Sequence, residues 1–452
     1  MSPVTGIRSA VGARWVRDAR RTTAEGPIMT EHRHLKRLVR ERMQRTGEAY
    51  TTALRHVLSA RDDASTDTVT DSRPRPAPAA PQHRVSALAR TMLAAAGLPV
   101  SEPMACGLGG GIGFLYAIFQ YKQVEHPMLT IVAQHHPQPW LEAVTAHLNA
   151  ASPAVEHRIV TSLSAKAAFD KLDATLETSP AWITVGRGGL PWHEIPEGPL
   201  GAAEAADPYP VVVTRGPEAG AYLIDDADGE MHTLSADELA TAWALHKKGR
   251  FAIETLAPLS ADTGVGADPA DGGGFHSEVV EASPTPDAVR ASVATTVAHL
   301  TGPVIHHAFD SNFGLSGMRK LATELRDDRT KAGWRRRFGD ARSFEVGMLR
   351  LAECLTWVHT APGGTRPLFA EFLREAAELL PAAERESWRE AAREADAAGE
   401  CWARVADTAA AGSTGNTDST DSTDKEATFD EFADLVEQAI AHEERMVVQL
   451  SR

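Results

Sequence analysis

The sequence predicts an α+β domain followed by an all-helical domain, and three observations lead to this prediction. Residues 211–233 contain short apolar runs separated by Gly-rich and Asp-Gly turns, which is typical of an antiparallel meander. From 287 to 411 the apolar residues recur at helical spacing. Between these regions, residues 260–274 are rich in Asp and Gly and show no periodicity, as expected of a linker. Because helices precede the strands, the first domain is α+β rather than all-β.

The elements of the first domain follow from local signals. Gly97 and Pro99 end a helix whose apolar face precedes them. Ser235 and Glu238 form a capping box that opens a later helix. In chain order we expect helices at 85–96, 140–148 and 165–176, strands at 128–133, 182–185, 211–214, 221–224 and 230–233, a helix from Ser235, and a strand at 250–256.

In the second domain the helical pattern is interrupted at Gly302-Pro303, Asn312–Gly317 and Pro362-Gly363-Gly364.

The chain as a whole divides into seven predicted segments: a basic helical extension at 1–62, a linker at 63–81, the α+β domain at 82–258, a linker at 259–284, the helical domain at 285–411, a flexible linker at 412–427 and an amphipathic helix at 428–452. The apolar stripe of the last helix fits either docking on the helical domain or pairing with another subunit as a homo-oligomer. Both Met1 and Met29 fit as the first residue.

Composition excludes several classes of protein. The formal net charge of −15 argues against a nucleic-acid-binding body, and the basic segment 31–61 is better explained as a solvated helix pair. The three cysteines have neither disulfide nor metal spacing, so we expect a reducing cytoplasm. No apolar run is long enough to span a membrane, and no secretory signal is evident. We expect no cofactor and no metal, because the neighbouring pairs His135-His136 and His306-His307 rarely converge on one ion.

The segment Gly107–Phe114 reads GLGGGIGF, and five of its eight residues are glycine. Its spacing fits neither a dinucleotide-binding loop nor a Walker loop. Glycine allows left-handed backbone and close approach of other groups. The run therefore indicates either a tight packing turn or a lining of a binding site.

Several motifs together resemble one family. They are the pattern ALxxxLxxxGLxxSExxxxGLGGGIGF, the strand end Leu190-Pro191-Trp192, the VVV…YLxD hairpin, and in the helical half Asn312–Gly317, Pro362-Gly363-Gly364 and Leu368–Ala376. They are similar to the N-terminal domain of the butirosin biosynthesis protein H (BtrH) family and to the uncharacterised helical domain that usually follows it. The resemblance covers about Gln82 to Leu380. It implies a papain-like fold of the bacteriocin-processing-peptidase type, and the founding member transfers an aminoacyl group from a carrier-protein thioester to an aminoglycoside amine.

The resemblance also implies a Cys-His-Asp site that this chain does not preserve. The thiol position before the first helix falls on His83 or at most Arg84, the base position falls on Tyr209, and only the third position keeps its residue type, as Asp225. We therefore expect a catalytically degenerate member. Asp225 should then serve its turn, accepting backbone N–H bonds alongside Asp226 and Asp228.

The expected function is that of a non-catalytic accessory or binding protein in a natural-product or peptide-modifying pathway. Its partner would be a carrier protein or a peptide, with a peptidyl or carrier-bound ligand. The residues expected to line the ligand cleft beside Tyr209 are Gly109, Gly110, Gly111 and Trp192.

An active enzyme is the alternative. Cys106 would then be the nucleophile, with His83 or His193 as its base, in acyl transfer or amide hydrolysis. Backbone N–H groups of the glycine run would lower the pKa of its thiol. A small buried cysteine without chemistry fits the same position.

Overall fold

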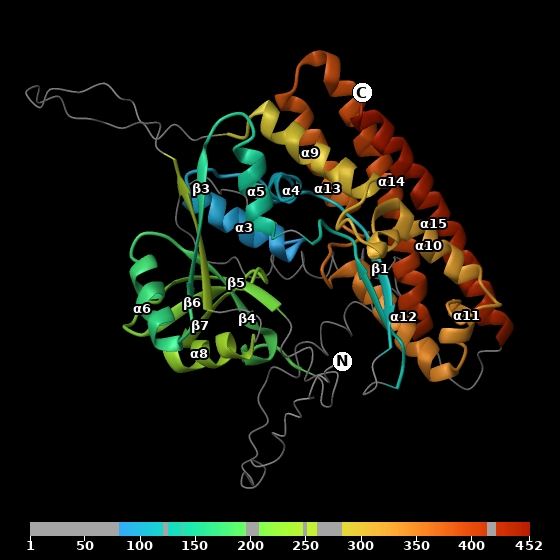
Figure 1. Cartoon of the computed structure of the whole chain (residues 1–452), viewed down its shortest axis with the longest axis horizontal. Helices are drawn as coiled ribbons and strands as arrows, with labels where there is room; N and C mark the ends of the chain where they lie inside the picture. Colours follow the sequence, from blue (N-terminus) through green and yellow to red (C-terminus); the bar gives the residue numbers. More distant parts are fainter. Residues whose placement is uncertain are drawn as a thin grey trace, which may run out of the picture. The chain divides into compact units, whose positions relative to one another are not determined.

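The structure is a computed structural model and describes residues 81–120, 125–137, 139–195, 208–246, 251–259, 283–413 and 422–452, with side chains from Lys425 onward in the last range. The chain divides into two compact units, 1–72 and 73–452, and all described residues belong to the second. The predicted extension at 1–62 and nearly all of the linkers at 63–81 and 259–284 lie outside the described residues. Figure 1 shows the described elements coloured along the chain.

Two short helices begin the described chain. They are α3 (Arg84–Ala95) and α4 (Glu102–Leu108). Gly97 has a φ of 77° after α3, as its expected role in ending the helix requires. The helix α4 was not predicted. It begins where the Ser101 side chain accepts the Met104 amide, 3.0 Å away, and Pro103 occupies its first turn.

The central sheet is antiparallel with six strands in the order β3-β8-β4-β5-β6-β7. Its strands are β3 (Val155–Ser162), β4 (Ala181–Gly186), β5 (Pro208–Arg215), β6 (Ala221–Asp225), β7 (Met231–Ser235) and β8 (Phe251–Pro258). The predicted meander is confirmed as β5-β6-β7. The edge strand β3 was not predicted, because its sequence VEHRIVTS has no apolar alternation.

Helices cover both faces of this sheet. They are α5 (Trp140–Leu148), α6 (Ala165–Thr175) and α8 (Ala236–Leu245), and the short turn η2 (Arg187–Gly189) follows β4. The helices α6 and α8 pack with one set of strand residues, among them Val211 and Val213. The helix α3 packs with the alternate set, which includes Trp182 and Val212. The capping box of Ser235 at the start of α8 is confirmed.

A separate hairpin lies beside the C-terminal helices. Its strands β1 (Leu115–Phe119) and β2 (Met128–Val132) pair antiparallel, with Leu115 opposite Val132. The hairpin packs on the helices α10 and α12 described next. Buried Tyr116 and Ile131 belong to their core.

The C-terminal region is helical, as predicted. Its elements are α9 (Pro286–Thr301), η3 (Ala308–Asn312), α10 (Gly314–Arg326), α11 (Trp334–Arg337), α12 (Ala341–Thr356), α13 (Arg366–Leu379), α14 (Ala382–Ser413) and α15 (Ser422–Leu450). The long helices α14 and α15 run side by side in Figure 1 and contact each other along their length. In the described chain, no helix has the length and apolarity to cross a membrane.

The last helix docks within the chain. It begins at Ser422, earlier than the predicted 428, and its stripe includes the buried residues Phe429, Phe432 and Val436. These residues share a core with α10, α12 and α14. Burial of the stripe therefore needs no second subunit.

The α+β segment and the helical segment share a hydrophobic core. Leu88, Met92 and Leu108 from the first segment join one cluster with Phe369 and Phe372 from the second. All five side chains are at most 1% exposed. The two sequence segments are thus packed together by their apolar faces.

Candidate functional site

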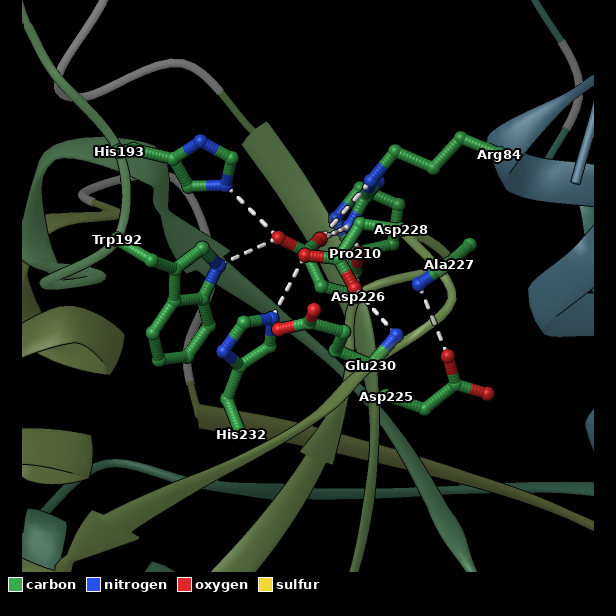
Figure 2. A network of polar contacts seen from close by, with 10 residues as sticks. All are labelled: Arg84, Trp192, His193, Pro210, Asp225, Asp226, Ala227, Asp228, Glu230 and His232. Atoms are coloured by element: carbon green, nitrogen blue, oxygen red, sulfur yellow. Dashed lines mark hydrogen bonds and ion pairs between the residues drawn. The ribbon is translucent and has the colours of Figure 1, made fainter. Parts of the chain in front are cut away.

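One buried carboxylate, Asp226, gathers polar side chains from the start of α3 and from the loop after η2 (Figure 2). Asp226 is 2% exposed. Its Oδ1 accepts from Arg84 Nε (3.0 Å) and Nη2 (2.6 Å), and its Oδ2 accepts from Trp192 Nε1 (2.7 Å) and His193 Nε2 (2.8 Å). Figure 2 shows Arg84 approaching from one side and Trp192 and His193 from the other. We call these four residues, with Tyr209, the Asp226 network.

The charge of Asp226 is stabilised despite its burial. Burial by itself would raise the pKa of this carboxyl. The hydrogen bond from His193, the charge of Arg84 and the hydrogen bond from Trp192 outweigh that effect and lower the pKa to about 2. Asp226 is therefore an anion at neutral pH, as a buried carboxylate with charged donors should be.

Tyr209 on β5 lies near two arginine side chains. The Arg84 guanidinium lies 3.5 Å from the centre of the Tyr209 ring, and that of Arg187 lies 5.9 Å from it. His193 meets the same ring edge-on, with centroids 5.0 Å apart. Burial raises the pKa of the Tyr209 phenol well above its usual range. A neutral phenol cannot act as the base that the resemblance implies at this position.

The structure places Arg84, not His83, beside the base position. Arg84 is the first residue of α3, and it contacts both Tyr209 and Asp226. His83 is the N-cap residue, and its ring is buried against Ser86 Oγ (2.6 Å from Nδ1) and Gln134 Oε1 (2.5 Å from Nε2). Burial lowers the pKa of His83 to about 4. A helix start directs successive side chains to different sides, so of the two candidate thiol positions Arg84 is the one that faces Tyr209.

Asp225 serves the turn, as predicted. Its Oδ1 accepts the Ala227 amide at 2.9 Å, and its Oδ2 accepts the Thr91 hydroxyl of α3 at 2.9 Å. Asp228 likewise accepts the Glu230 amide at 3.0 Å. Asp226, between them, was also expected to accept backbone N–H groups of the turn, and that expectation was wrong. Its side chain points into the Asp226 network instead.

Sequence reasoning singled out His193 and Trp192 but gave Asp226 no role in a site. A signal for Asp226 was present in the spacing. Tyr222 and Ile224 are the buried residues of β6, and Asp226 continues that period of two. The sequence could therefore have identified Asp226 as an acidic residue on the buried side of the strand, which needs hydrogen-bond donors or a counter-charge.

An aromatic stack borders the network. Trp192 lies over His232 with ring centroids 4.0 Å apart and planes 10° from parallel. His232 in turn bonds to Asp228 at 2.7 Å. This stack fixes the indole whose N–H reaches Asp226.

Cys106 does not have the surroundings of a nucleophile. Its side chain is fully buried in α4, in a small apolar cluster with Ala361 and Leu368. Burial raises the pKa of its thiol to about 12, although a hydrogen bond with Ser86 opposes this. His83 reaches the same Ser86, but with its lowered pKa it does not favour a thiolate-imidazolium pair. Of the candidate bases, His193 belongs to the Asp226 network instead.

The glycine run packs against aromatic side chains and lines no open cleft. A Cβ on Gly109 would lie 2.2 Å from the Trp140 ring, and one on Gly110 2.4 Å from the His135 ring. Gly111, at a φ of 64°, lies against Phe369. The expectation that Gly109, Gly110 and Gly111 line a ligand cleft with Trp192 is wrong, since these glycines are buried and their missing side chains make room for rings.

The members of the histidine pairs have separate structural contacts. His135 stacks on His299 with centroids 4.6 Å apart, and His136 stacks on Phe313. His307 caps the short η3 turn. Over the described ranges, no three potential metal ligands converge.

Comparison with known families gives a match to the helical region. Residues 268–450, which include α9 to α15, match the family described as a domain of unknown function, DUF4872. No curated protein matches the chain. The match covers the helical region and leaves the α+β segment with the Asp226 network outside it.

The two neighbouring acids offer a matched test of the network. We expect Asp226→Asn to lower the free energy of unfolding by about 2 kcal/mol or more, because it leaves Arg84 half-buried without its counter-charge. Asp225→Asn should change it by only about 0.5 kcal/mol, since the amide keeps an oxygen for the turn. Urea unfolding of both variants measures the difference. Equal losses would contradict the assignment of Asp226 as the central group.

Proposed function

We propose that this protein is a BtrH-like, papain-like protein that binds a peptidyl or carrier-bound ligand without turning it over. Its setting would be a natural-product or peptide-modifying pathway, in which it acts as an accessory protein. One observation carries the proposal: Arg84, one of the two positions that the resemblance gives the thiol, contacts Tyr209 at the base position and pairs with Asp226, the residue after the third position Asp225.

The arrangement of elements supports a papain-like origin for this site. The first residue of a helix, α3, lies against the strand β5, which carries Tyr209, and next to the turn after β6. A helix start beside an antiparallel sheet is where a thiolate of this family would be stabilised. In this chain Arg84 stands at that helix start, beside Tyr209.

The replaced side chains favour binding over catalysis. Arg84 cannot act as a nucleophile at any physiological pH, because its guanidinium stays protonated. Tyr209 keeps its proton. The Asp226 carboxylate is fully engaged with donors on both oxygens. What remains is a rigid set of cationic and aromatic groups suited to recognition.

A thioester assay tests the proposal. Purified full-length protein and its Cys106→Ala variant are each mixed with an acyl N-acetylcysteamine thioester, and thiol release is followed with a chromogenic reagent. We expect neither to exceed the buffer rate. Hydrolysis by the wild type that Cys106→Ala abolishes would establish the active-enzyme alternative instead.

Restoring the family's residues gives the converse test. The double variant Arg84→Cys with Tyr209→His should hydrolyse the thioester about 10²-fold faster than the wild type, because a base and its orienting carboxylate are again beside the thiol. The matched control is His83→Cys with Tyr209→His, which places the thiol against Gln134 and should remain inactive. Activity of the control and not of the first variant would contradict the placement of Arg84.

A further inference from the structure

One ring nitrogen of His193 is available to a ligand. Its Nε2 lies 2.8 Å from Asp226 Oδ2. Figure 2 shows the other nitrogen, Nδ1, on the side of the ring that faces away from this carboxylate. Among the residues that the structure describes, Nδ1 has no hydrogen-bond partner, and the side chain is 17% exposed. A ligand can therefore reach Nδ1 while Nε2 stays bound to Asp226.

Asp226 decides which of the two nitrogens carries the proton. Its carboxyl is an anion at neutral pH, because its donors lower its pKa to about 2. An ionised carboxylate only accepts hydrogen bonds, so the proton in its bond with His193 belongs to Nε2. In the neutral imidazole Nδ1 then keeps its lone pair. Nδ1 is thus an acceptor, and the carboxylate behind the ring increases its basicity.

The orientation of this acceptor is fixed by the residues around it. The Tyr209 ring meets the imidazole edge-on, with centroids 5.0 Å apart, and the His193 amide donates to the Leu190 carbonyl at 3.1 Å. Rotation of the imidazole would break its bond to Asp226. An acceptor that is held in this way loses little conformational entropy when a ligand binds.

His193 also lies close to the position that the resemblance gives the catalytic base. That position is Tyr209, whose ring the imidazole contacts. The rings of Tyr209 and Trp192 are both half-buried, so each leaves part of its apolar surface for a ligand. A ligand at this place would meet one fixed acceptor beside aromatic surface.

We propose that His193 Nδ1 binds an amide N–H group of a peptidyl ligand, and that Asp226 sets the tautomer on which this bond depends. The inference rests on the proposed function and narrows its ligand to one with an N–H donor next to the acyl group. The bond joins two uncharged groups, so it needs no excess of either charge around the site. An ester oxygen in place of the N–H would leave Nδ1 without a donor.

Two uncharged probes of the same shape test the inference on the full-length protein at pH 8. N-acetyl-phenylalanine dimethylamide has a single N–H group, and an oxygen replaces that N–H in its ester analogue. We expect the amide to bind about tenfold more tightly in titration calorimetry, because the ester oxygen would face the lone pair of Nδ1. Salt should leave this ratio unchanged, since neither probe is charged.

One variant separates the two ring nitrogens. His193→Gln keeps an N–H donor for Asp226 but has no acceptor at the position of Nδ1. We expect it to lose the tenfold preference for the amide while its urea midpoint stays close to that of the wild type. His306→Gln is the matched control, because His306 is exposed on the segment after α9, and it should change neither quantity.

Nitrogen NMR of the wild type tests the tautomer without a ligand, so the inference can be judged even if His193→Gln unfolds. In histidine-labelled protein at pH 8, we expect the His193 ring to carry its proton on Nε2 alone. A proton on Nδ1 would overturn the inference.

The binding outcomes separate this inference from the proposed function. Equal binding of the two probes, failure of both to bind at millimolar concentration, or a preference for the amide that survives in His193→Gln would each overturn the inference. None of these results requires turnover, so the proposed function would stand. Cleavage of the ester probe by the wild type would instead contradict the proposed function.

Discussion

Replacing Glu443 by alanine is expected to lower the free energy of unfolding by about 3–5 kcal/mol. Glu443 of α15 and Arg366 of α13 form an ion pair in which both side chains are 0% exposed. Two bonds join them, Nε to Oε1 at 2.8 Å and Nη2 to Oε2 at 3.1 Å. Truncation would leave a guanidinium buried in the core without its counter-charge, and such an uncompensated charge is among the most costly defects in a protein interior.

The pair also joins separate parts of the fold, which adds to the expected loss. Arg366 Nη1 donates to the carbonyls of Ala133, after β2, and Gly364. Trp402 of α14 donates to Glu443 Oε1 at 3.3 Å. Loss of Glu443 therefore affects the contacts of α13, α14, α15 and the β1-β2 hairpin together.

The neighbouring residue provides the control. Glu444 pairs with Arg319 on the surface, where both side chains are about half exposed. Glu444→Ala should cost no more than about 1 kcal/mol. Urea unfolding compares the two variants, and similar midpoints would contradict the buried-pair argument. The double variant Arg366→Met with Glu443→Leu should recover much of the loss, because it removes both charges.

Acidification is expected to destabilise the protein below pH 6.5. Burial lowers the pKa of His83 to about 4, and it also lowers the pKa values of His136, His147, His299 and His359. The unfolded chain then binds more protons than the folded chain. The stability that these neutral rings contribute is complete above pH 6.5 and is lost as the pH falls toward 4.

His83 alone accounts for a measurable part of this effect. Between pH 6.5 and 5 its contribution is about 2 kcal/mol, at roughly 1.4 kcal/mol for each pH unit. The buried carboxyl of Glu102 has a raised pKa and opposes the trend at lower pH, so the window from 7.5 to 5 is the informative one.

A variant tests whether His83 causes this pH dependence of the free energy of unfolding. The free energy of unfolding is measured in urea at pH 7.5, 6.5, 5.5 and 5.0 for the wild type, His83→Gln and the exposed control His306→Asn. We expect His83→Gln to have a shallower pH dependence and His306→Asn to follow the wild type. An unchanged slope in His83→Gln would show that other groups carry the proton linkage.

Local signals in the sequence predicted most of the elements. The end of α3 at Gly97, the capping box at Ser235 and the strands β5, β6 and β7 all follow from residues within a few positions of each other. Two elements were not predicted, because their sequences lack a clear local signal for a helix or a strand. The short helix α4 ends in a glycine run, and the edge strand β3 has no alternation.

The candidate site was predictable in part. The resemblance pointed to Tyr209, to the acidic turn and to the start of α3, and the structure brings these three places together. Sequence spacing alone could not choose between His83 and Arg84, because adjacent residues at a helix start differ only in the direction they face. The position of Arg84 was decided by the strands against which α3 packs.

The sequence by itself determined most of the order of helices and strands. It also determined that neither cysteine nor histidine stands at the positions that the resemblance implies for a thiol and a base, and whether each residue found there is neutral or charged. Tertiary structure alone decided that the glycine run receives the rings of Trp140 and Phe369, and that Arg366 meets Glu443 across 77 positions of chain. The reason is physical: caps, turns and periodicity act between neighbours in sequence, whereas burial and charge pairing depend on residues that only the completed core brings within contact.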